Sequence, residues 1–172
     1  MLDRIPFGPI LVILTLLSAV SFPAVVVMGW LVSRGTLSVP VHVQWSIPIT
    51  LLSIFTHAII MFYFIGTGSR IKEVVKELKL DVRLYRRTLP FKARVFPLSM
   101  LTMTLVMAAT ILGGGAHTRF PWTPPWLHGL LAVASAVCNG MLALREIGCI
   151  SENLTLVDDV DVAVLAATRQ PV

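Results

Sequence analysis

The stretch that decides the fold is IPFGPILVILTLLSAVSFPAVVVMGWLVS, residues 5–33, which lies between Arg4 and Arg34. It is 29 residues long and has no ionisable side chain, and about 20 consecutive apolar residues are enough for a helix to cross a bilayer. A secretory signal peptide has a shorter apolar region. We therefore expect a retained transmembrane helix here, with cleavage after Ala19 or Ala24 as the alternative.

Three further apolar runs of spanning length follow along the chain. Hydrophobic residues make up 56% of the chain and charged residues 13%, compared with about 25% charged residues in a typical soluble domain. This balance excludes a soluble globule and a disordered chain. We predict an all-α integral membrane protein, a four-helix transmembrane bundle within residues 1–150. The expected spans are about 7–32, 45–67, 95–115 and 124–147.

The distribution of charge predicts the orientation in the membrane. Residues 70–94 hold nine of the 14 Lys and Arg residues and carry a net charge of +6, so the positive-inside rule places this basic loop and both termini in the cytoplasm. The expected outer loops carry only Arg34 and Arg119 as charges. The four tryptophans lie at the outer ends of the spans, as in an interfacial aromatic belt; they are Trp30, Trp45, Trp122 and Trp126. We expect a multi-pass protein of a bacterial inner membrane and, because the basic residues cluster beside apolar runs, no nucleic-acid partner.

The basic loop has the spacing of an amphipathic helix. Apolar residues recur at intervals of three or four, and they are Ile71, Val74, Leu78, Val82, Tyr85 and Leu89. We predict one cytoplasmic helix that continues from the second span and is stopped by Pro90. Its apolar stripe rests on lipid or on the bundle, or else it is a docking surface for a partner or for anionic lipid headgroups. The basic residues of that surface are Lys72, Lys76, Lys79, Arg83, Arg86 and Arg87.

Residues 151–172 form an acidic segment on the same predicted side as the basic loop. Four carboxylates, Glu152, Asp158, Asp159 and Asp161, stand against Arg169. We expect a cytoplasmic tail that contacts the basic loop. Exposed ion pairs contribute only about 0–1 kcal/mol each, so this contact would guide packing without dominating it.

His57 is the most informative residue for function. We expect it to be the one ionisable side chain within the span cores, apart from cysteine thiols and Tyr63, and such groups are costly in lipid and face protein, water or a cofactor. Met61 follows one helical turn later. His57 and Met61 are therefore candidate ligands for a b-type haem or a soft copper ion, and a proton or quinone role is a further candidate for His57. The alternative is a neutral histidine hydrogen-bonded to a neighbouring helix.

The remaining histidines predict a second candidate site on the outer face. His42, His117 and His128 fall in or near the expected outer loops, and three imidazoles are enough to bind copper or zinc. Their spacing matches no local metal-binding motif. Solvated loop histidines are the alternative interpretation.

The fourth span carries a stripe of small residues at intervals of three and four. These are Gly129, Ala132, Ala136 and Gly140. Small residues let helix backbones approach closely in lipid, and the neighbouring Asn139 can donate a hydrogen bond across helices. We expect this stripe to pack against another helix, either of this chain or of another subunit.

The chain lacks the residues that several classes of enzyme and transporter require. The chain has no Gly-rich phosphate loop, nucleophile elbow or HExxH motif, and its only cysteines, Cys138 and Cys149, form no CxxC pair. No acidic residue is expected in a span core, which argues against multidrug-type transporters. We predict a non-catalytic membrane subunit or scaffold that assembles with other membrane proteins. The alternatives are a redox subunit with a b-type haem or quinone beside His57, and a small carrier or channel.

The predicted orientation can be tested with reporter fusions. A topology reporter inserted at Leu80, in the basic loop, and one at Thr118, in the last outer loop, should report opposite sides of the membrane. Equal signals at the two positions would overturn the count of four spans.

Overall fold

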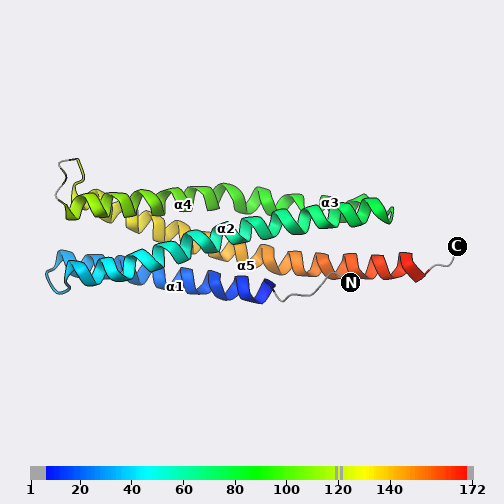
Figure 1. Ribbon diagram of the computed structural model, residues 1–172, viewed down its shortest axis with the longest axis horizontal. Helices are drawn as coiled ribbons and strands as arrows, with labels where there is room; N and C mark the ends of the chain where they lie inside the picture. Colours follow the sequence, from blue (N-terminus) through cyan, green and yellow to red (C-terminus); the bar gives the residue numbers. More distant parts are fainter. Residues whose placement is uncertain (1–6, 119, 121, 170–172) are drawn as a thin grey trace.

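The computed structural model describes residues 7–118, 120 and 122–169. Every regular element among them is a helix: α1 Phe7–Ser33, α2 Val39–Glu77, α3 Val82–Arg86, α4 Leu89–His117 and α5 Pro125–Arg169 (Figure 1). Four helices are long and apolar enough to cross a membrane, so the prediction of an all-helical bundle with four helices of spanning length is confirmed. Arg119 and both chain ends lie outside the described residues, and the cytoplasmic location of the termini stays a prediction.

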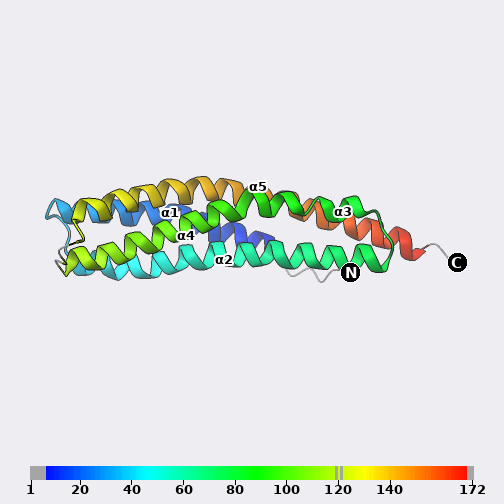
Figure 2. The same ribbon diagram turned by 90° about the horizontal axis from the view of Figure 1, so that it is seen from above.

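The four long helices form an elongated bundle (Figures 1 and 2). α1 packs against α2 and α5, and α4 packs against the same two helices, so α2 and α5 face each other across the diagonal. The α1–α2 and α4–α5 connections lie at one end of the bundle, and α3 and the last turns of α5 lie at the other (Figure 1). The diagonal pair therefore runs in the same direction along the bundle axis.

The basic loop differs from its prediction as a single helix stopped by Pro90. α2 continues through Gly68 to Glu77 and ends in a turn in which Lys79 has a φ of 50°. Asp81 then caps α3 by accepting a hydrogen bond from the backbone N–H of Arg83 at 2.8 Å. Pro90 lies in the first turn of α4, where its missing N–H costs no helical hydrogen bond. The prediction was wrong because the apolar spacing stays in phase across the turn.

The end of α2, α3, the first turns of α4 and the end of α5 form a helical extension beyond the apolar spans. α5 has 45 residues, hence a length of about 68 Å at 1.5 Å per residue, roughly twice the hydrocarbon thickness of a bilayer. Residues 151–169 thus continue α5 instead of forming a separate tail. The apolar core also continues into the extension, where its buried members include Ile71, Val75, Phe91, Leu156 and Val160.

The predicted contact between the basic loop and the acidic segment is confirmed. Arg87 pairs with Asp159 at 2.7 Å, and Arg94 pairs with Glu152 at 2.6 Å. By donating hydrogen bonds, the Arg94 guanidinium holds the pKa of the Glu152 carboxyl below its ordinary value. Both pairs are half exposed, so they align α5 with α3 and α4 more than they stabilise the fold.

Two glycines provide a matched test of this backbone. Gly35, in the turn after α1, has a φ of 72°, whereas Gly66 is inside α2 and a Cβ there would meet nothing within 4 Å. Gly35→Ala should lower the free energy of unfolding by about 1–2 kcal/mol because the left-handed conformation strains a Cβ. Gly66→Ala should raise it by about 0.5–1 kcal/mol because alanine loses less backbone entropy. Unfolding in mixed detergent micelles measures both changes, and equal signs for the two variants would contradict the assigned conformations.

Candidate functional site

Polar side chains from all four long helices fill the middle of the bundle. Each is at most 1% exposed, and the set comprises Thr15, Ser18, Ser53, Thr56, His57, Ser99, Thr102, Ser135, Asn139 and Glu146. Large apolar side chains such as Val20, Phe62 and Ile111 face outward instead and are at least 70% exposed. This distribution suits a lipid solvent, in which polar groups must find their partners inside the protein.

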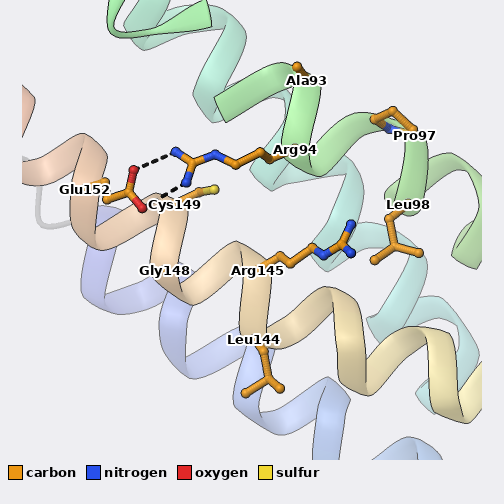
Figure 3. A pocket seen from close by; sticks show the side chains of 9 residues that line it. All are labelled: Ala93, Arg94, Pro97, Leu98, Leu144, Arg145, Gly148, Cys149 and Glu152. Atoms are coloured by element: carbon orange, nitrogen blue, oxygen red, sulfur yellow. Dashed lines mark hydrogen bonds and ion pairs between the residues drawn. The ribbon is translucent and has the colours of Figure 1, made fainter. Parts of the chain in front are cut away.

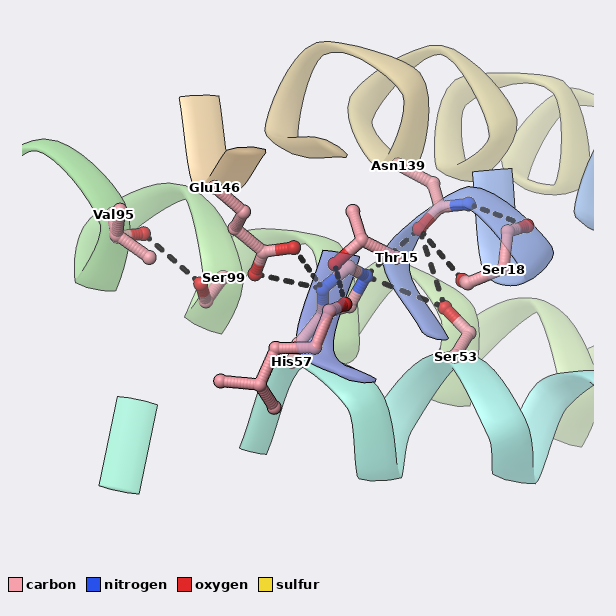
Figure 4. Close-up of polar contacts among 9 residues, drawn as sticks. Thr15, Ser18, Ser53, His57, Val95, Ser99, Asn139 and Glu146 are labelled. Carbon is pink, nitrogen blue, oxygen red and sulfur yellow. Dashed lines mark hydrogen bonds and ion pairs between the residues drawn. The ribbon is translucent and has the colours of Figure 1, made fainter. Parts of the chain in front are cut away.

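The centre of this polar network is an imidazole paired with a carboxyl group (Figure 4). His57 Nδ1 lies 2.9 Å from Glu146 Oε1 and 3.1 Å from Oε2. Because His57 belongs to α2 and Glu146 to α5, the pair bridges the diagonal of the bundle. The expectation that His57 has no acidic neighbour inside the bundle was wrong: Glu146, at the end of the fourth apolar run, is fully buried against it.

A signal for Glu146 was present in the sequence. Ser135, Asn139, Leu142 and Glu146 follow one another at intervals of four, three and four, which places them on one helical face, and all four are buried. The sequence analysis instead assigned helix packing to the small-residue stripe, which lies on a different face of the same helix. Glu146 stands beside Arg145 at the end of the apolar run, so its charge suggested a boundary instead of a core position.

Asn139 fixes the orientation of the histidine ring. Its Nδ2 donates to the backbone oxygen of Ser18 at 3.1 Å, which turns Oδ1 toward His57 Nε2 at 2.8 Å. The hydroxyls of Ser18 and Ser53 also donate to Oδ1, at 3.3 and 3.4 Å. Because a carbonyl oxygen accepts only, Nε2 must carry a hydrogen and donate it to Asn139.

This constraint leaves one shared proton between His57 Nδ1 and Glu146. Either a carboxylic acid donates it to a neutral ring, or an imidazolium donates it to a carboxylate. Both arrangements have zero net charge, which reduces the large cost of burying a single ion. Removing the proton would leave a buried carboxylate facing a ring lone pair, and adding another would leave a buried positive charge.

Two buried hydroxyls beside the pair have no partner among the described residues: those of Thr56 and Thr102. Thr50 and Thr110 meet at 3.4 Å and set the antiparallel register of α2 and α4. In that register, Thr56 and Thr102 are about two residues, or roughly 3 Å, apart along the axis. Both hydroxyls are therefore free to bond another polar group at the level of His57.

The two predicted haem ligands, His57 and Met61, differ in burial: His57 is fully buried and Met61 is only partly buried. Met61 lies one turn beyond His57, and both ring nitrogens of His57 already contact Glu146 or Asn139. An axial bond to haem iron would have to replace one of these contacts. The geometry therefore favours the hydrogen-bonded histidine over the haem alternative.

The structure brings together two of the three outer histidines. The rings of His42 and His128 are 6.4 Å apart in an edge-on arrangement, and His128 Nδ1 lies 2.8 Å from the backbone oxygen of Ala109. Among the described residues, no three His, Cys, Asp or Glu side chains are grouped to hold a metal ion. His117 accordingly does not join the other two.

The small-residue stripe is partly buried, whereas the basic residues are exposed. A Cβ added at Gly129 or Gly140 would meet nothing within 4 Å, and Ala132 and Ala136 are only partly buried, so this face is not closely packed against a neighbouring helix. The predicted docking residues are all exposed on the helical extension: Lys72, Lys76, Lys79, Arg83, Arg86 and Arg87. Arg87 is the one that pairs with Asp159.

No family model, curated protein or solved structure matches the chain. Its function must therefore be argued from its own residues. In the part of the chain that the structure describes, the network around His57 and Glu146 joins two buried ionisable groups inside the apolar bundle.

Substitutions of Glu146 test the hydrogen-bond assignment. Glu146→Ala should lower the free energy of unfolding by about 3–5 kcal/mol because it leaves His57 buried without its partner. Glu146→Gln should cost less than about 1.5 kcal/mol, since its amide can donate to Nδ1 of the neutral ring. Detergent unfolding measures both, with the exposed Glu152→Gln as the control. A glutamine variant as unstable as the alanine variant would contradict the assigned proton positions.

Proposed function

We propose that the protein is a four-span membrane subunit that takes up and releases a proton at the His57–Glu146 pair. The observation that carries this proposal is the 2.9 Å contact between two ionisable groups that are fully buried between helices of the bundle. Ionisable residues inside a membrane are expensive, and they commonly mark proton or ion pathways.

A change in protonation would act on the diagonal of the bundle. The hydrogen bonds between α2 and α5 come from Ser53, His57 and Tyr63, and α2 otherwise packs against α1 and α4. Gaining or losing a proton changes the charge of the pair by one unit and weakens its internal hydrogen bonds. The resulting shift of α2 relative to α5 is the mechanical output, and the hydroxyls of Thr56 and Thr102 provide further steps for a proton between α2 and α4.

We further propose that the helical extension lies in the cytoplasm and binds other protein subunits. The net charge of +6 in residues 70–94 supports a cytoplasmic helical extension by the positive-inside rule, and we propose a bacterial inner membrane as the location. The extension carries exposed basic side chains that suit acidic partners. The protein thus acts as a subunit with its proton site in the bilayer and its docking surface in the cytoplasm.

The second candidate function is a scaffold without any proton chemistry. It is favoured by the small-residue face of α5, where Gly129 and Gly140 have open space around them and a helix of another subunit can approach closely. In that case the His57–Glu146 pair only fixes the packing of the bundle, and its protonation state never changes.

Infrared spectroscopy of the full chain in lipid nanodiscs separates the two functions. A proton site should show a carboxylic acid carbonyl band whose intensity changes with pH, and this band should be absent from Glu146→Gln but kept in Glu152→Gln. The same variants, reconstituted into liposomes with an internal pH-sensitive dye, report whether the site also conducts protons.

The two measurements have distinct outcomes. A titrating band without proton flux supports a protonation-driven change of shape. A band with flux that Glu146→Gln abolishes supports a relay. If the wild-type and Glu146→Gln difference spectra are the same at every pH at which the proteins stay folded, the proton function is wrong and the scaffold function stands.

A further inference from the structure

A groove of about 540 Å³ lies between α4 and α5 (Figure 3), and neither His57 nor Glu146 lines it. One part of its wall is apolar and is formed by Pro97, Leu98 and Leu144. Another part is charged and is formed by Arg94, Arg145 and Glu152. Leu144 is 76% exposed, so the apolar wall opens toward the surroundings of the bundle.

The groove holds two positively charged groups, Arg94 and Arg145, and one negatively charged group, Glu152. Arg94 donates two hydrogen bonds to Glu152, at 3.0 and 2.6 Å, and these two groups neutralise each other. Arg145 extends toward α4 (Figure 3) and forms no ion pair with any described residue. The groove therefore has one positive charge in excess, located on a guanidinium whose planar fork suits a phosphate group.

The groove lies where the apolar spans end. Residues 95–116 have no charged side chain, and Arg94 directly precedes them. Residues 120–144 have none either, and Arg145 directly follows them. The two arginines thus mark the same boundary on neighbouring antiparallel helices. We expect lipid headgroups to begin at this depth beside the outward-facing arginines, with acyl chains on the side of Pro97 and Leu98.

We propose that this groove binds one anionic phospholipid. Its phosphate pairs with Arg145, and one acyl chain lies along Pro97, Leu98 and Leu144. A headgroup with a single negative charge matches the single excess positive charge. A lipid fits better than a free anion because much of the wall is apolar and lies on the hydrocarbon side of the charges.

Gly148 keeps the groove open and permits a steric test. It lines the groove, and a Cβ placed there would meet nothing within 4 Å. Gly148→Leu should therefore fill the groove without disturbing the packing of α5. Gly140, two turns earlier on the same helix, also has open space around it but does not line the groove. Gly140→Leu is the matched control.

The experiment is native mass spectrometry of the purified full chain with added phosphatidylglycerol or phosphatidylcholine of identical acyl chains. The wild type should retain one phosphatidylglycerol in preference to phosphatidylcholine. Arg145→Gln and Gly148→Leu should each reduce this adduct several-fold, and Arg145→Lys should keep part of it. Gly140→Leu and Arg34→Gln, the latter on the opposite side of the membrane, should bind like the wild type.

Three outcomes would overturn the proposal. Equal retention of the two lipids would remove the role of headgroup charge. An unchanged adduct in either Arg145→Gln or Gly148→Leu would place the lipid elsewhere. Displacement of phosphatidylglycerol by an equal concentration of inorganic phosphate would identify a site for soluble anions.

Discussion

The contact between His57 and Glu146 sets conditions that the rest of the bundle has to meet. An imidazole and a carboxyl group can stay in a bilayer only if their hydrogen-bonding atoms are satisfied by protein. Glu146 satisfies Nδ1, and Asn139 satisfies Nε2. Asn139 is held in turn by Ser18 and Ser53, so three of the four long helices must keep one relative rotation and depth.

The bundle meets these conditions by turning its polar faces inward and its apolar faces outward. Its apolar core runs from the spans, where Leu11, Ile60 and Leu142 are buried, into the helical extension, where Ile71 and Leu156 are buried. Apolar packing therefore holds the helices together along the whole bundle, and the hydrogen bonds around His57 add to it within the spans. Under the proposed proton function, a shift of α2 against α5 at the His57–Glu146 pair would reach the exposed basic surface of the extension, because α2 continues unbroken to Glu77.

The sequence predicted the candidate site only in part, and the reason is physical. His57 stood out because a single histidine inside a long apolar run is costly wherever the helix faces. Glu146 did not, because it lies at the end of an apolar run and next to Arg145, a position typical of a membrane boundary. Its burial depends on the length of α5, on its rotation and on the reach of the glutamate side chain. None of these is encoded locally.

The number of spans, their apolar character and the concentration of positive charge in residues 70–94 were determined by the sequence alone, because crossing a bilayer is a property of each segment by itself. The turn at Lys79 and the continuation of α5 to Arg169 became visible only in the fold, since apolar spacing is the same for one helix and for two pieces in phase. Which polar groups meet was decided by tertiary structure. Helix packing sets rotation and depth, and these bring His57 to Glu146 and leave Arg145 in a groove with no ion-pair partner among the described residues.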